Sequence, residues 1–315
     1  MVLEELQREI RRLKEERGVL LCAHYYQDLA VQDVADVVGD SLKLARVAQE
    51  HPQRVVVFAA VKFMAETAAI MNPDKSILLP DVGARCPMAA YAPAQKVREA
   101  REEHPGVPVV LYVNSVAGAK AEADVTCTSS NAVEVVTRAC QEAGSKRVLF
   151  GPDANLGRWV AKQTGLEVLP LPPEGHCFVH KLFQVDDVER AMREHPGASL
   201  IAHPECDEEV LDRADFVGST AKLWNHVETT PGSGKVFLVA TEVNFVRRAA
   251  RDFKQHVVLP LVDKARCFSM AKIELSKVLD VLRNVDRAEE WRVVVPPDVA
   301  ERARAAISKM FQYTS

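Results

Sequence analysis

Residues 77–86 read ILLPDVGARC, and similar stretches follow at residues 167–177 (EVLPLPPEGHC) and 257–267 (VVLPLVDKARC). The cysteines that end these three copies lie 91 and 90 residues apart, at Cys86, Cys177 and Cys267. A period of this length is too long for a solenoid of short units and indicates small domains present in three copies. We therefore expect three related domains, each of which contributes one cysteine.

Other residues keep the same register in all three copies. Matched aspartates stand at Asp36, Asp124 and Asp215, and matched hydroxyl residues follow five positions later at Ser41, Ser129 and Thr220. Twelve residues before each aspartate a predicted strand ends, which aligns His24, Tyr112 and His203, and two residues farther on, Tyr26, Asn114 and Glu205. We interpret the aspartates as scaffold residues that bond local backbone. The hydroxyl residues are interpreted as helix caps that could also place helix N-termini around an anion.

Continuous apolar runs such as VLLCAHYY and RVVVFAAV alternate with amphipathic helical stretches along the whole chain. This alternation is typical of parallel sheets covered by helices on both faces. The predicted fold is α/β, with three homologous three-layer αβα domains related by a pseudo-threefold axis. The expected domain ranges are 1–82 together with 268–315, 83–172, and 173–267. Ligands bind outside the carboxyl ends of such strands, so the matched residues are expected to line one central cavity.

Composition excludes several classes of function. The chain is 48% hydrophobic and 27% charged, with a formal net charge of −4, which is ordinary for a globular protein. No cluster of basic residues predicts a nucleic-acid surface. The N-terminal stretch LEELQREIRRLKEE lacks the apolar core of a signal peptide, and no apolar run approaches the ~18 residues of a membrane span. We expect a cytoplasmic protein with neither nucleic-acid nor membrane partners.

The odd number of cysteines, seven, argues against a disulfide framework and favours metal or thiol chemistry. Thiolates of Cys86, Cys177 and Cys267 could hold a [4Fe-4S] cluster by three corners and leave the fourth iron open as a Lewis acid. A three-cysteine zinc site is the alternative, because thiolates alone do not choose between the two. Structural roles are expected for Cys22, Cys127 and Cys140, whereas the role of Cys206 is left open.

Candidate proton-transfer residues cluster at the predicted strand ends. Tyr26 and Glu205 occupy matched positions and form a plausible acid/base pair. Three histidines could transfer protons or orient a substrate, namely His24, His180 and His203.

These residues resemble the quinolinate synthase family, the iron–sulfur enzymes of de novo pyridine nucleotide synthesis. The matching segments include AHYYQDLAVQDVADVVGDSLKLA (23–45), LLPDVGARCPMA (78–89), HCFVH (176–180) and AHPECDEEVLDRADFVGST (202–220), and they extend over residues 21–279. The resemblance implies condensation of iminoaspartate with dihydroxyacetone phosphate to quinolinate, with loss of phosphate and two waters. It leaves open whether an L-aspartate oxidase hands over iminoaspartate in a transient contact or whether iminoaspartate diffuses in.

The resemblance also implies roles for individual residues. Cys86, Cys177 and Cys267 resemble the ligands of the family's [4Fe-4S] cluster. Tyr26 resembles the acid/base of a tautomerisation, Glu205 the base of the late steps, and His203 a catalytic partner. The residues that resemble the substrate-binding set are His24, Ser41, Tyr112, Asn114, Ser129, His180, His203, Glu205 and Thr220.

Two other functions compete with this one. The first is a zinc-stabilised protein that binds a dicarboxylate without turnover, which would have little need of the acid/base groups Tyr26 and Glu205. The second is an iron–sulfur hydro-lyase acting on a hydroxy acid, which would not bind phosphate at Ser129 and Thr220.

Overall fold

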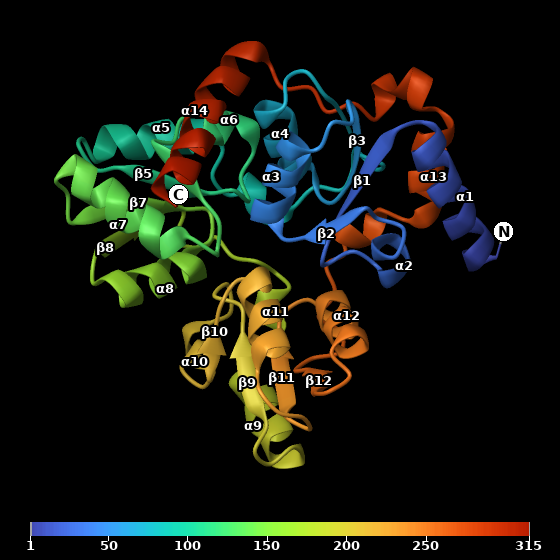
Figure 1. Ribbon diagram of the computed structural model, residues 1–315. Helices are drawn as coiled ribbons and strands as arrows, with labels where there is room; N and C mark the ends of the chain where they lie inside the picture. Colours follow the sequence, from blue (N-terminus) through green and yellow to red (C-terminus); the bar gives the residue numbers. More distant parts are fainter. Residues whose placement is uncertain (1, 315) are drawn as a thin grey trace. The chain divides into compact units, whose positions relative to one another are not determined.

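The three repeats fold into three parallel four-stranded sheets of identical strand order, which confirms the predicted parallel sheets. The structure is a computed structural model that describes residues 2–314 (Figure 1). The sheet orders are β2-β1-β3-β4, β6-β5-β7-β8 and β10-β9-β11-β12. The strands are β1 (Val19–His24), β2 (Val37–Gly39), β3 (Val55–Ala59), β4 (Ser76–Leu78), β5 (Val109–Tyr112), β6 (Val125–Cys127), β7 (Arg147–Gly151), β8 (Glu167–Pro170), β9 (Ser199–Ala202), β10 (Phe216–Val217), β11 (Val236–Ala240) and β12 (Val257–Pro260).

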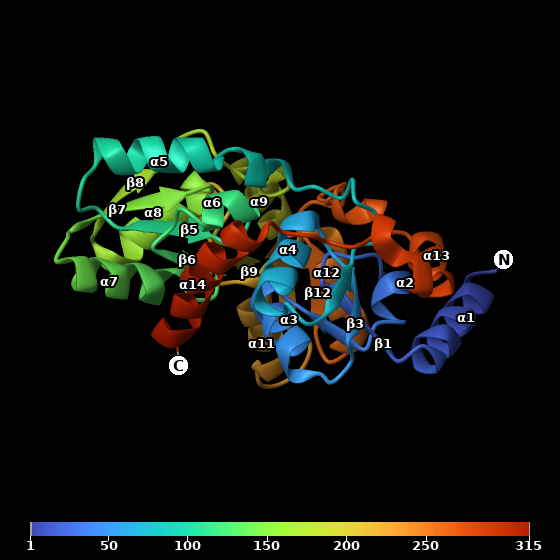
Figure 2. The same ribbon diagram turned by 90° about the horizontal axis from the view of Figure 1, so that it is seen from above.

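Helices cover each sheet and complete three sandwiches, which we number in chain order. The first has α1 (Leu3–Glu16), α2 (Leu29–Gln32), α3 (Ser41–Glu50), α4 (Lys62–Met71) and α13 (Leu275–Arg283). The second has α5 (Ala94–Glu103), α6 (Ala117–Lys120), α7 (Ala132–Ala143) and α8 (Ala154–Thr164). The third has α9 (Val185–Glu194), α10 (Glu208–Leu211), α11 (Thr220–Thr229) and α12 (Val243–Asp252). In the first sandwich α1 packs against α13 and α3 against α4, on opposite faces of the sheet (Figure 2).

The central strands explain why the sheets are parallel and covered. Every residue of β1 is buried, and so are the last four residues of β3 and of β11. Strands that are apolar on both faces need a helical layer on each side. In every sheet the first and third strands of the repeat are neighbours, so the strand order reverses between them. Ligands of such sheets bind at this reversal, beyond the carboxyl ends of the strands.

The matched aspartates tie the first two strands of each sandwich together. Oδ2 of each aspartate accepts a backbone N–H from the residue fifteen positions earlier, at 2.8, 2.7 and 2.8 Å. The pairs are Asp36 with Leu21, Asp124 with Val109, and Asp215 with Leu200. The predicted scaffold role is confirmed.

The cysteine loops also repeat in three dimensions. In each repeat, the first residue of the helix after the third strand donates its backbone N–H to the carbonyl two residues before the cysteine. Each of these hydrogen bonds is 2.8 Å long. These bonds join Lys62 to Ala84, Ala154 to Gly175, and Val243 to Ala265. Short 3-10 helices follow the cysteines, namely η1 (Pro87–Ala90), η2 (His180–Leu182) and η3 (Met270–Lys272). Each loop is therefore anchored beside the strand-order reversal of its sheet.

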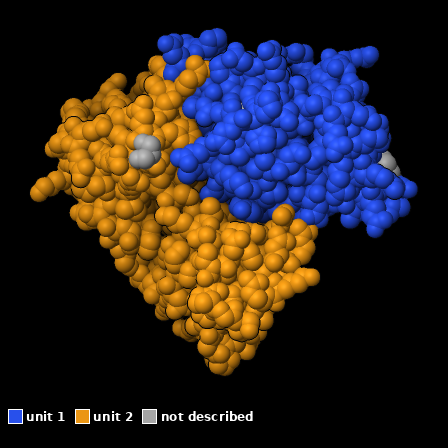
Figure 3. All heavy atoms as spheres, viewed as in Figure 1, with its two compact units in different colours: residues 1–86, 267–301 blue, residues 87–266, 302–315 orange. Residues whose placement is uncertain are grey.

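By its internal contacts the chain forms two compact units, coloured in Figure 3. Unit 1 comprises residues 1–86 and 267–301, and unit 2 comprises residues 87–266 and 302–315. The second and third sandwiches thus share a unit. The predicted ranges placed 268–315 with the first domain, whereas the end of α14 (Pro297–Tyr313) groups with unit 2, where Lys309 pairs with Glu142 at 2.8 Å. The remaining segment before α14 contains η4 (Val285–Glu290). The division into three domains stays a prediction.

Among the described residues, no helix combines the length and the apolar character that crossing a membrane would require.

Candidate functional site

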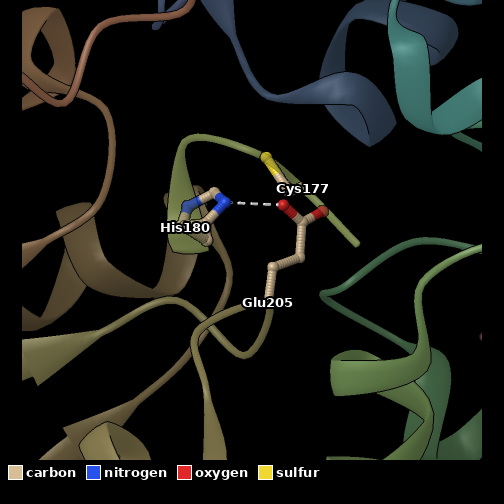
Figure 4. Close-up of side chains that lie close together, drawn as sticks. All are labelled: Cys177, His180 and Glu205. Carbon is tan, nitrogen blue, oxygen red and sulfur yellow. Dashed lines mark ion pairs between the residues drawn. The ribbon is translucent and has the colours of Figure 1, made fainter. Parts of the chain in front are cut away.

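Glu205 lies at the centre of a buried cluster at the carboxyl end of the third sheet. It follows β9 by three residues and is 3% exposed. Nδ1 of His180 lies 2.7 Å from Oε2 of Glu205, and Nδ1 of His203 lies 3.9 Å from the same oxygen (Figure 4 shows the His180 contact). The two imidazole rings stack with their centroids 4.6 Å apart. Three predicted site residues thus lie in contact.

The surroundings of Glu205 keep it ionised. Burial alone would raise the pKa of its carboxyl group, but the charges of His180 and His203 and the hydrogen bonds from His180 and Tyr112 lower that pKa to about 2. Opposite charges within a few ångströms favour the charged form of a carboxylate in this way. Tyr112, at the end of β5, therefore belongs to the same site although it comes from the second sandwich.

Both histidines are oriented by further hydrogen bonds. Nε2 of His180 lies 3.1 Å from Oγ1 of Thr241, which leaves Nδ1 facing Glu205. Nδ1 of His203 accepts the backbone N–H of Glu205 at 3.3 Å, and Nε2 of His203 lies 3.2 Å from Oγ of Ser129. When His203 is neutral and its Nδ1 accepts this N–H, the ring proton is on Nε2, which can donate to Ser129.

Three residues of this cluster escaped the sequence analysis: Asp153, Asn155 and Thr241. Asp153 caps α8, where Oδ1 accepts the N–H of Leu156 at 2.7 Å. Burial and the negative charge of Glu205 raise the pKa of Asp153 well above its usual range. Asn155 donates from Nδ2 to the carbonyl of Glu205 at 2.9 Å. The start of α8 thus holds the turn that carries Glu205.

The hydroxyl residues predicted as helix caps stand one position or more away from the caps. Ser41 and Thr220 are the first residues of α3 and α11, and the capping side chains are those of Asp40 and Ser219. The residue directly before α7 is Asn131, and Ser129 lies two positions earlier in the chain. The capping interpretation is therefore wrong for these residues. Their proposed contact with an anion stays a prediction.

His24 and Tyr26 of the first repeat are arranged in the same way as His203 and Glu205 of the third repeat. His24 ends β1 and is 3% exposed, and its Nδ1 accepts the backbone N–H of Tyr26 at 3.1 Å. The two rings meet edge to face with centroids 4.6 Å apart. In the second repeat, Oδ1 of the matched Asn114 is buried without a hydrogen-bond partner among the described residues. An amide oxygen in that position is suited to contact a ligand.

The seven cysteines divide into two groups. The matched residues Cys86, Cys177 and Cys267 are partly exposed, whereas the other four are buried. Burial raises the pKa of Cys22 to about 12 and also raises the pKa values of Cys127, Cys140 and Cys206. Thiols with raised pKa values are poor ligands, because a metal binds the thiolate. Cys206 is further engaged, since its Sγ donates to the carbonyl of Ala240 at 3.5 Å. It therefore has a structural role.

Within unit 1 a group of hydrogen bonds ties the segment before Cys86 to the segment after Cys267. Lys277 donates to Oδ2 of Asp81 at 2.6 Å, and the N–H of Gly83 donates to Oδ1 at 2.7 Å. Lys272 and Ser269 bind carbonyls of the first segment, at 2.9 Å to Gly83 and 2.7 Å to Arg85. We call Asp81, Gly83, Ser269, Lys272 and Lys277 the clamp.

Unit 2 holds a mixed group of potential metal ligands. Sγ of Cys177, a ring nitrogen of His180 and a carboxylate oxygen of Glu205 all lie within 4.8 Å of one another (Figure 4). This donor set could hold a metal ion such as zinc, which binds thiolate, imidazole and carboxylate ligands.

The chain resembles known proteins over nearly its whole length. The family model described as quinolinate synthetase A protein matches residues 8–312. The quinolinate synthase of Methanoregula boonei is 47% identical over 305 residues, with 97% of each chain covered. Those of Pyrococcus furiosus and Thermococcus onnurineus are both 45% identical, over 316 and 312 residues, with 98% and 99% of each chain covered.

Proposed function

Since this chain belongs to the quinolinate synthase family, we propose that it condenses iminoaspartate with dihydroxyacetone phosphate to form quinolinate. The reaction releases one phosphate and two waters, and its atoms balance without an external oxidant or reductant. The observation that carries the proposal is the buried carboxylate of Glu205 held between two imidazoles and a phenol, because proton transfers are what this condensation requires. A dicarboxylate binder without turnover would need no such arrangement.

A [4Fe-4S] cluster held by Cys86, Cys177 and Cys267 is part of this proposal. Partial exposure of these three thiols and burial of the other four support the assignment. Held by these three thiolates, the cluster would have one iron without a protein ligand, and that iron would supply a Lewis acid for the loss of hydroxyl groups. The clamp would fix the spacing of two of the three ligands.

Glu205, His203 and His180 are assigned to proton transfer in the late steps. A carboxylate whose pKa is about 2 is ionised at any working pH but is a weak base by itself. The stacked imidazoles would therefore share the proton that Glu205 accepts, with Thr241 and Ser129 fixing their orientation. His180 also contributes to substrate binding in this assignment.

Tyr26 is assigned as the acid/base of the tautomerisation, with His24 and Ser41 beside it. The edge-to-face contact with His24 and the bond to Nδ1 support a fixed position for Tyr26. The remaining substrate-binding residues are proposed to be Tyr112, Asn114, Ser129 and Thr220. A phosphate would suit the start of α11, where Thr220 is the first helical residue. Delivery of iminoaspartate by an L-aspartate oxidase and a cytoplasmic location stay predictions.

Anaerobic purification with iron and sulfide analysis, followed by a quinolinate assay, tests this function. We expect about four irons per chain, lost in Cys177→Ala and kept in the control Cys140→Ala, whose thiol is buried. Tyr26→Phe and Glu205→Gln should keep the cluster and lower kcat by about 10²- to 10⁴-fold. Failure of the zinc-free protein to assemble a cluster from iron and sulfide, or full activity of Glu205→Gln, would overturn the proposal.

A further inference from the structure

We propose that the cluster-free protein binds a single Zn²⁺ ion through Cys177, His180 and Glu205. This site would share only Cys177 with the cluster, so the zinc form and the cluster form would exclude each other. The competition rests on the cluster assignment proposed above, whereas the zinc site itself rests on unit 2 alone. It differs from a zinc site made of the three matched thiols, because Cys86 and Cys267 take no part.

The geometry needs little movement to accept the ion. The three ligand atoms lie within 4.8 Å of one another, and tetrahedral Zn²⁺ with bonds of 2.0–2.3 Å separates its ligand atoms by about 3.4–3.7 Å. His180 Nδ1 and Glu205 Oε2, now 2.7 Å apart, would separate by less than about 1 Å as the ion replaces their direct contact. Cys177 is partly exposed, which gives the ion a path to a site whose other ligands are buried.

Charge and orientation also suit zinc. One thiolate and one carboxylate balance the two positive charges of the ion, so the buried complex would be neutral. Thr241 contacts Nε2 of His180 at 3.1 Å, which leaves Nδ1 toward the ion as in zinc sites whose histidine is oriented by a second hydrogen bond. A mixed sulfur, nitrogen and oxygen set binds Zn²⁺ more tightly than Fe²⁺. Three protein ligands leave the fourth position to water.

Cobalt titration of the cluster-free protein, kept reduced and anaerobic, tests the site. We expect one Co²⁺ per chain with the charge-transfer absorption of a single thiolate, and displacement by one Zn²⁺ measured against a chromophoric chelator. Cys177→Ala, His180→Ala and Glu205→Gln should each weaken binding by at least about a hundredfold, because loss of an outer partner alone costs 10- to 100-fold. Cys86→Ala and Cys267→Ala are the matched controls and should bind as the parent does.

The outcomes separate this proposal from the others. Loss of the thiolate absorption in Cys86→Ala or Cys267→Ala would overturn it in favour of a three-thiolate site, and absence of the absorption in the parent would overturn it outright. Circular dichroism of each variant shows that it has folded. Reconstitution with iron and sulfide adds a second readout, since Zn²⁺ should block it in the parent but not in His180→Ala. If no variant assembles a cluster, the cluster assignment fails while the titration still decides the zinc site.

Discussion

Asp81→Ala tests whether the clamp holds two cluster ligands in place. Oδ1 and Oδ2 of Asp81 accept from Gly83 and Lys277, and the side chains of Asp81 and Lys277 are 20% and 38% exposed. Burial opposes ionisation of Asp81, but the hydrogen bonds from Lys277 and Gly83 lower its pKa. Because its pKa is lowered on folding, the stabilisation by ionised Asp81 is complete above the ordinary pKa of an aspartate and is lost as the pH falls through the pKa of the folded state. This stabilisation is therefore fully present near neutral pH.

The magnitude follows from the two contacts that the substitution removes. A half-exposed ion pair contributes at most about 1 kcal/mol, and a hydrogen bond to backbone contributes about 1 kcal/mol. Their sum of about 2 kcal/mol corresponds to roughly a thirtyfold shift in an equilibrium, at 1.36 kcal/mol per factor of ten. If the clamp acts only by ordering the two segments, the affinity of Asp81→Ala for the cluster should fall by up to this roughly thirtyfold factor. Loss of an outer partner at metal sites has effects of the same size.

The assay is anaerobic release of iron to a chelator, followed by the loss of visible absorption. Asp81→Ala and Lys277→Met should each release iron faster than the parent. Expressed as a change in free energy, the effect of the double variant should be smaller than the sum of the two single effects by about 1 kcal/mol. Asp286→Ala is the matched control, because it breaks an exposed ion pair with Arg17 in the same unit. Equal release from Asp81→Ala and Asp286→Ala would show that the clamp does not hold the ligands.

Two further predictions concern stability, measured by urea unfolding. Asp124→Ala should lower the free energy of unfolding by about 2 kcal/mol, because the buried N–H of Val109 loses its acceptor, whereas Asp124→Asn should lower it by less than about 1 kcal/mol. Above about pH 4, the free energy of unfolding of Asp153→Asn should rise relative to that of the parent by about 1.4 kcal/mol per pH unit. The reason is that the raised pKa keeps a proton on Asp153 in the folded parent, whereas the unfolded chain has lost that proton. Parallel pH curves for parent and Asp153→Asn would mean that Asp153 is ionised.

The repeat made the fold predictable, because it shows which residues have equivalent surroundings. Asp36, Asp124 and Asp215 recur since each satisfies the N–H of a strand neighbour, and that requirement is the same in every copy. Continuous apolar strands separated by helices are likewise typical of parallel sheets that are covered by helices on both faces. Caps were harder to place, because the capping residue is set by a single extended backbone position, as at Asp40 with φ −83° and ψ 179°.

Two of the three residues that sequence analysis missed, Asp153 and Asn155, act between repeats. Asn155 of the second sandwich donates to the carbonyl of Glu205 in the third, a contact with no counterpart inside one copy. Asp153 was recoverable in principle, because it stands where Glu242 stands in the third repeat, directly before the helix that follows the third strand. The equivalent residue of the first repeat is Val61. A position that varies between valine, aspartate and glutamate gives no repeated signal.

The same variation explains how three copies of one fold can present different chemistry. The position two residues after the matched strand end carries a phenol in Tyr26, an amide in Asn114 and a carboxylate in Glu205. Its backbone N–H binds Nδ1 of the preceding histidine in the first and third copies alike, at 3.1 and 3.3 Å. Position is therefore fixed by the backbone that the copies share, whereas the functional group is free to differ. An alignment of the repeats can locate such residues, but their chemistry follows only from the side chain that each copy carries.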